Sequence, residues 1–139
     1  MDKMRWRYGD TNPVVAAVNG DTVIEIGDAV FQNVNEALPA SEFPLGPTEF
    51  KDYFLGVAMQ RSRKGDTSNI RVATTGVFEF DCEPRNWELG DLVRMVGNQN
   101  VAGTDYAEHA IGRVAKFQHE FYSSPVLVDI RSTVMTGGV

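Results

Sequence analysis

The motif Gly-Asp-x-Val occurs twice in this chain, in "IEIGDAVFQ" at residues 24–32 and in "WELGDLVRM" at residues 87–95. Apolar residues precede and follow both copies. Glycine tolerates the positive φ angle that a tight turn can require, and an aspartate side chain can accept hydrogen bonds from nearby backbone amides. The motif therefore predicts a turn that leads into a β-strand, at two places in the sequence.

The segments that follow the two motifs come in the same order. The first motif is followed by "FLGVAMQ" (54–60) and "NIRVATTGVFEF" (69–80), and the second by "AIGRVAK" (110–116) and "VLVDIRSTV" (126–134). Each time, a short glycine-containing strand precedes a longer strand. We interpret this order as a degenerate internal duplication of residues 23–80 and 86–134. The alternative to a duplication is that these short matches arose by chance in a glycine-rich β protein.

Alternation of apolar and polar residues predicts which side chains face the core. In "VLVDIRSTV" the apolar residues alternate with Asp129 and Arg131, which is the period of a half-buried strand. "NIRVATTGVFEF" alternates in the same way on both sides of its glycine. The residues expected to face inward are Val72, Val93, Val126, Val128 and Ile130.

The sequence predicts an all-β fold with little helix. Helical turns are expected only near residues 33–38 and 46–54, and residues 96–109 are expected to form a loop because they contain two glycines. With 139 residues, the chain is long enough for one hydrophobic core. We expect a small β-sandwich or barrel, jelly-roll-like, with long loops. An extended N-terminal arm over residues 1–20 would precede a single domain over residues 21–136.

Charge and composition narrow the classes of function. The net charge of −6 argues against a nucleic-acid partner, and no apolar run approaches the roughly 20 residues that would span a membrane. No sequence motif for a metal, a phosphate or a catalytic nucleophile is present. We therefore expect no catalytic residues, no metal site and no cofactor.

The first eight residues, "MDKMRWRY", differ in charge from the rest of the chain. Their local charge is +2, which leaves −8 for the remaining residues. Trp6 and Tyr8 alternate with Arg5 and Arg7, after Lys3. Tryptophan, tyrosine and arginine are the usual anchors of protein interfaces. Base stacking is the other interpretation of this pattern, but an acidic body would repel a nucleic acid. We predict that these residues dock on a partner protein.

The order of motifs resembles the capsid cement, or head decoration, proteins of tailed phages. The segments that carry the resemblance are "GDAVF", "FLGVAMQ", "IRVATTGVFEF", "WELGDLVRM", "AIGRVAK" and "VLVDIR". They cover residues 23–134, but a longer insertion at residues 33–53 and the first 17 residues depart from the shortest members of that family.

The resemblance implies a non-enzymatic virion protein, made in the host bacterial cytoplasm, that binds the outside of an assembled icosahedral shell and bridges its capsomers. Its expected partners are the major capsid protein and itself, as a homotrimer. Long strand edges and apolar loop residues need cover, so Phe43, Phe50 and Tyr53 are candidate subunit or capsid contacts.

Two other classes of function remain open from the sequence. A carbohydrate-binding or adhesive β module would use exposed aromatic residues such as Trp87, Tyr106 and Tyr122. A small enzyme would assemble a site from loops, with His109 beside Glu108 or Asp105.

Overall fold

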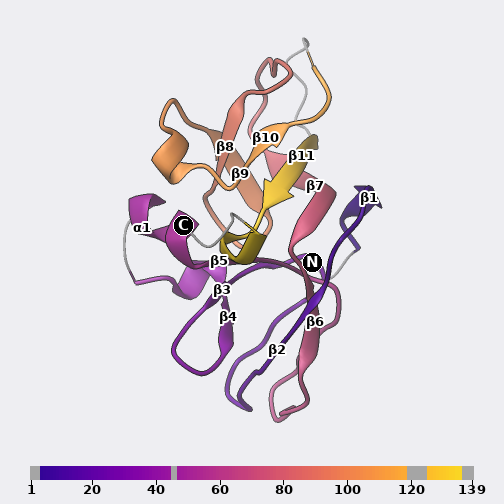
Figure 1. The fold of residues 1–139 in the computed structure, drawn as a ribbon, viewed down its shortest axis with the longest axis vertical. Helices are drawn as coiled ribbons and strands as arrows, with labels where there is room; N and C mark the ends of the chain where they lie inside the picture. Colours follow the sequence, from indigo (N-terminus) through magenta and orange to yellow (C-terminus); the bar gives the residue numbers. More distant parts are fainter. Residues whose placement is uncertain (1–3, 45–46, 119–124, 136–139) are drawn as a thin grey trace.

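The computed structural model describes residues 4–44, 47–118 and 125–135. Over these residues the chain forms eleven β-strands, one α-helix and three short 3₁₀-helices. The strands make two sheets that lie one above the other along the long axis of the molecule (Figure 1). The predicted all-β class, a small barrel or sandwich, is confirmed.

The first sheet is built from residues of the first half of the chain, and we call it the N-terminal sheet. Its order is β2 (Val14–Ala16), β6 (Ile70–Ala73), β5 (Phe54–Ala58), β3 (Ala29–Gln32) and β4 (Ala37–Pro39). All neighbouring strands are antiparallel. The Ala37 N–H also donates to the Ala17 carbonyl over 2.8 Å, which joins the two ends of this sheet.

The second sheet closes on itself, and we call it the C-terminal barrel. Its order is β7 (Thr75–Cys82), β11 (Val126–Arg131), β10 (Gly112–Val114), β8 (Leu92–Met95) and β9 (Asn100–Gly103). Parallel pairing of β9 with β7 closes the barrel. Strand β1 (Trp6–Tyr8) is added antiparallel to β7 as a sixth strand.

The helices are short and lie outside the two sheets. They are η1 (Ala40–Glu42), α1 (Pro47–Tyr53), η2 (Ala107–His109) and η3 (Thr133–Met135). Helix α1 begins at Pro47, which fits the helix predicted over residues 46–54, because proline is well tolerated in a first helical turn.

Three local predictions are wrong. Residues 33–38 form a hairpin turn and the start of β4, because β4 pairs along β3. The expected loop over residues 96–109 contains β9, which pairs on both sides. The long strand expected over residues 69–80 is divided at Thr74, where the chain passes from β6 in one sheet to β7 in the other.

The two sheets repeat one pattern of pairing. The orders β2-β6-β5-β3-β4 and β7-β11-β10-β8-β9 correspond strand by strand. The registers correspond too, since Val30 pairs with Gly56 as Val93 pairs with Gly112. This likeness supports a duplication but changes its predicted bounds. The repeats run from β2 to β6 and from β7 to β11, so β7 belongs to the second repeat and not, as expected, to the first.

The repeat extends to the core, where both halves bury side chains at the same positions. The buried cluster of the N-terminal sheet is Ala16, Val18, Ile24, Val30, Ala37, Leu55, Ala58, Ile70 and Val72. The corresponding residues in the barrel are Phe80, Cys82, Trp87, Val93, Val101, Ile111, Val114, Val126 and Val128, which are buried or half-buried in the larger cluster. All five residues predicted to face inward are buried, including Ile130.

The two Gly-Asp turns have the same geometry. Gly27 and Gly90 have φ angles of 96° and 85°, which favour glycine. One carboxylate oxygen of Asp28 accepts the Glu25 N–H over 3.0 Å, and Asp91 accepts the Glu88 N–H over 2.9 Å. The predicted turn chemistry is confirmed in both copies.

One end of the barrel sits on the outer face of the N-terminal sheet. The Ala29 N–H donates to the Asn98 carbonyl over 2.7 Å, and the Ser132 N–H donates to the Thr74 carbonyl over 3.0 Å. Ala29, Val57 and Ala73 are fully buried in the larger hydrophobic cluster, together with barrel residues. The outer face of the N-terminal sheet is therefore an internal contact surface.

Two glycines at equivalent positions, Gly56 and Gly112, allow the neighbouring strand to approach closely in each half. A Cβ on Gly56 would lie inside the van der Waals distance of the Ala73 carbonyl oxygen, and one on Gly112 would meet the Asp129 carbonyl oxygen. We expect Gly56→Ala and Gly112→Ala each to lower the free energy of unfolding by about 2 kcal/mol or more. Gly97→Ala, where the nearest atom would be 3.7 Å away, should change it by less than about 0.5 kcal/mol. Urea denaturation measures all three, and equal stabilities would contradict the close strand approach.

Candidate functional site

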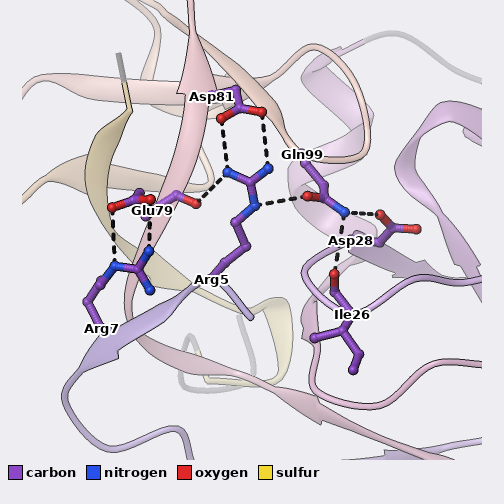
Figure 2. Close-up of polar contacts among 7 residues, drawn as sticks. All are labelled: Arg5, Arg7, Ile26, Asp28, Glu79, Asp81 and Gln99. Carbon is purple, nitrogen blue, oxygen red and sulfur yellow. Dashed lines mark hydrogen bonds and ion pairs between the residues drawn. The ribbon is translucent and has the colours of Figure 1, made fainter. Parts of the chain in front are cut away.

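Arg5 is one of the predicted docking residues, and its side chain is not on the surface. Its side chain is only 2% exposed. The guanidinium donates to both carboxylate oxygens of Asp81 at 3.1 Å, to the Glu79 carbonyl at 3.1 Å and to the Gln99 side chain at 2.9 Å (Figure 2). Such a planar fork of donors matches a carboxylate bidentately. Arg5 is therefore an internal anchor of the strand that follows it.

Gln99 carries this network into the N-terminal sheet. Its amide nitrogen donates to the Asp28 carboxylate over 2.8 Å and to the Ile26 carbonyl over 3.4 Å (Figure 2). Asp28 belongs to the first Gly-Asp turn, whereas Gln99 lies in the hairpin between β8 and β9. One chain of hydrogen bonds therefore joins the N-terminal segment to both halves of the molecule.

The expectation of an arm over residues 1–20 that stands apart from the body needs correction. The segment is extended, but β1 pairs with β7 and β2 pairs with β6. Paired strands satisfy their backbone hydrogen bonds, and Arg5 adds buried polar contacts, so both effects hold the segment in place. Lys3 lies outside the described residues.

Arg7 points to a different partner and stays on the surface. Its guanidinium meets the two carboxylate oxygens of Glu79 at 2.8 and 3.1 Å, and 38% of its side chain is exposed (Figure 2). Both arginines are therefore paired within the chain. The prediction that they are available to a partner's carboxylates needs correction, since Glu79 and Asp81 already occupy their bidentate faces.

Three apolar side chains are exposed in and next to β1, over residues 4–8. Met4, Trp6 and Tyr8 are 44%, 39% and 51% exposed. The Trp6 indole N–H donates to the Gly9 carbonyl over 2.9 Å, which fixes the ring. Strand β1 is the last strand on its side of the described sheet. Backbone and aromatic surface are thus presented together at one sheet edge, which we call the β1 edge.

The second predicted set, Phe43, Phe50 and Tyr53, forms an aromatic cluster around α1. The Phe43 ring lies 5.1 Å from Phe50 and 5.8 Å from Tyr53, measured between ring centres. Phe50 is buried, Phe43 is half-buried and Tyr53 is 45% exposed. Phe50 is therefore a core residue, and only the other two can contribute contact surface.

Phe43 and Tyr53 line a groove of about 740 Å³. Its other apolar walls come from the hairpin between β3 and β4, from β5 and from η3; these residues are Phe31, Val34, Leu55 and Val134. Val34, at the hairpin tip, is 87% exposed. We call this the aromatic groove.

Among the described residues, the aromatic side chains named for a carbohydrate-binding module do not share one surface. Trp87 is fully buried in the barrel core, so it cannot stack on a sugar. Tyr106 is 58% exposed, and its ring centre lies 5.2 Å from that of His109. Tyr122 lies outside the described residues. Where the structure describes the chain, no three His, Cys, Asp or Glu side chains are grouped to hold a metal ion.

Comparisons with protein-family models, with curated proteins and with solved structures found no match for this chain. In the described part of the chain, no helix has the length and apolar character needed to cross a bilayer.

Substitutions at the two arginines separate the buried anchor from the surface pair. We expect Arg5→Ala to lower the free energy of unfolding by about 2–4 kcal/mol, because it leaves Gln99 and the Glu79 carbonyl without a donor and opens a cavity. Arg7→Ala removes a solvent-exposed pair and should lower it by less than about 1 kcal/mol. Chemical denaturation compares them, and an Arg5→Ala protein as stable as the wild type would contradict the anchor.

Proposed function

We propose that this protein is a non-enzymatic capsid decoration protein that binds the outside of an assembled tailed-phage shell and bridges its capsomers. The major capsid protein would be its partner, and the virion surface its location. The ordered motifs of the sequence support this proposal through the resemblance that they carry. The β1 edge is the structural observation that supports it most directly.

The β1 edge suits protein docking in two ways. Backbone at a sheet edge can pair with an added strand of a partner, and flanking side chains can fill pockets on it. Trp6 and Tyr8 provide large contact area with few rotatable bonds, and the first ring is already fixed by its bond to Gly9. Because Arg5 and Arg7 are neutralised within the chain, apolar and backbone contacts would dominate this interface.

Self-association is the second part of the proposal. The aromatic groove, lined by Phe43 and Tyr53, would hold a contact between neighbouring subunits of a homotrimer. Tyr53→Asp would place a charge in that contact while leaving the buried Phe50 in place. The protein would be released from decorated particles, and its molar mass measured by light scattering. The wild type should be a trimer and the variant a monomer. A wild-type monomer would contradict this part.

Co-sedimentation with shells tests the docking. Particles would be purified from a host strain in which this gene is deleted, and then incubated with the purified protein. The wild type should sediment with the particles. Desolvated aromatic anchors are typically worth ~2 kcal/mol each, so Trp6→Ala with Tyr8→Ala should weaken binding by about a thousandfold.

Tyr106→Ala is the matched control, because Tyr106 is an exposed aromatic residue in the connection between β9 and η2. It should bind particles like the wild type. Wild-type protein that does not sediment with the particles would overturn the proposed function. A double variant that binds with unchanged affinity would retain the function but move the docking surface away from the β1 edge.

A further inference from the structure

A concave surface lies on the outer face of the C-terminal barrel, beneath α1 and η2. Its volume is about 430 Å³. Three cationic side chains line it from different elements: Lys51 from α1, Arg113 from β10 and Arg131 from β11. It is separate from both the β1 edge and the aromatic groove, and we call it the cationic pocket.

The cations of this pocket have no ion-pair partner in the described chain. There, the ion pairs within 4 Å are Arg5 with Asp81 and Arg7 with Glu79. Asp129 is the single carboxylate in the lining, and its backbone lies opposite that of Arg113 in the sheet. The pocket therefore has a charge of about +2 from its side chains, within a protein whose net charge is −6.

Two of the three cations are held in position. The Lys51 ammonium donates to the Ala107 carbonyl over 3.1 Å, and the Arg113 guanidinium donates to the Gly90 carbonyl over 2.9 Å. Each retains further N–H donors, because an ammonium carries three and a guanidinium five. This anchoring lowers the ordering entropy that ligand binding would cost.

The rest of the lining is mostly apolar. Leu92 is half-buried, whereas Ala110 and Ile111 are buried beneath the surface. The volume lies within the range of ligand sites and exceeds that of a single small anion. A ligand that carries both carboxylates and an apolar side chain matches these walls.

Comparison of the two halves shows why this face is available. Leu92, Arg113 and Asp129 form a row across β8, β10 and β11. The corresponding row of the N-terminal sheet is Ala29, Val57 and Ala73, which is buried against the end of the barrel. The same face thus receives a neighbouring part of the protein in one half and carries charges at the surface in the other.

We propose that the cationic pocket binds an acidic peptide segment of a partner protein. Its carboxylates would pair with Arg113, Arg131 and Lys51, and an apolar side chain would rest on Leu92. Asp129 repels any anion, and the repulsion is greater for the dense charge of a phosphate group than for the single charge of a carboxylate. This inference does not rest on the proposed function, since it concerns another face of the molecule.

The probe is an acetylated hexapeptide that alternates leucine with glutamate, and its control alternates leucine with glutamine. ¹H–¹⁵N spectra of the intact protein should show shifts at the amides of residues 112–114 and 127–131 when the acidic peptide is added. The glutamine peptide should produce no such shifts. Added salt should weaken binding, because the attraction is between charges.

Variants that each remove one charge test whether the shifts come from the pocket. Arg113→Gln and Arg131→Gln should each weaken peptide binding by about tenfold, and Asp129→Asn should strengthen it a few-fold, because it removes the repelling carboxylate. Arg71→Gln is the matched control, since Arg71 is an exposed strand arginine on the other sheet, and it should bind like the wild type. Dispersed spectra would show that each variant is folded.

Three results would overturn the proposal. They are equal binding of the glutamine peptide, unchanged affinity in the two arginine variants, and shifts with inorganic phosphate where the peptide produces none. The last result would indicate a small-anion site instead.

Discussion

The buried guanidinium of Arg5 is the contact on which the arrangement of this protein depends. It brings together β1, the end of β7 and the hairpin between β8 and β9, and through Gln99 it reaches the first Gly-Asp turn. A buried charge is tolerated only when it is paired and hydrogen-bonded, and Arg5 meets both conditions. The first strand is thereby fixed to both halves, and its exposed aromatic side chains project from a fixed backbone.

The repeated architecture explains how one scaffold provides several surfaces. Both halves use the same strand order, the same Gly-Asp turn and the same buried positions. These shared features determine the fold of each half. The halves differ on their outer faces. Small apolar residues in the first half make an internal contact, whereas Arg113 and Asp129 in the second half leave a charged surface. The 14-residue connection that holds α1 also supplies the aromatic groove, as well as Lys51.

Local sequence patterns predicted β3, β5, β8, β10 and β11, and they predicted β6 and β7 as one strand. They also predicted the Gly-Asp turns and the core faces, because these depend on neighbouring residues. The role of Arg5 could not be predicted in this way, since its side-chain partners Asp81 and Gln99 lie 76 and 94 positions away. Strand β9 was missed because "NVAG" is short and ends in glycine. Burial of Trp87 had a usable signal: it occupies the position of Ile24 in the first motif, where an apolar core residue is expected.

Amide hydrogen exchange tests most directly the proposal that the β1 edge docks on a viral shell. Exchange would be measured for the protein free and bound to particles. If a partner strand is added, the amide of Trp6, which faces away from β7, should exchange more slowly in the bound protein, while those of residues 62–66, on a distant loop, should not change. Protection confined to other surfaces, with unchanged exchange in β1, would contradict the account.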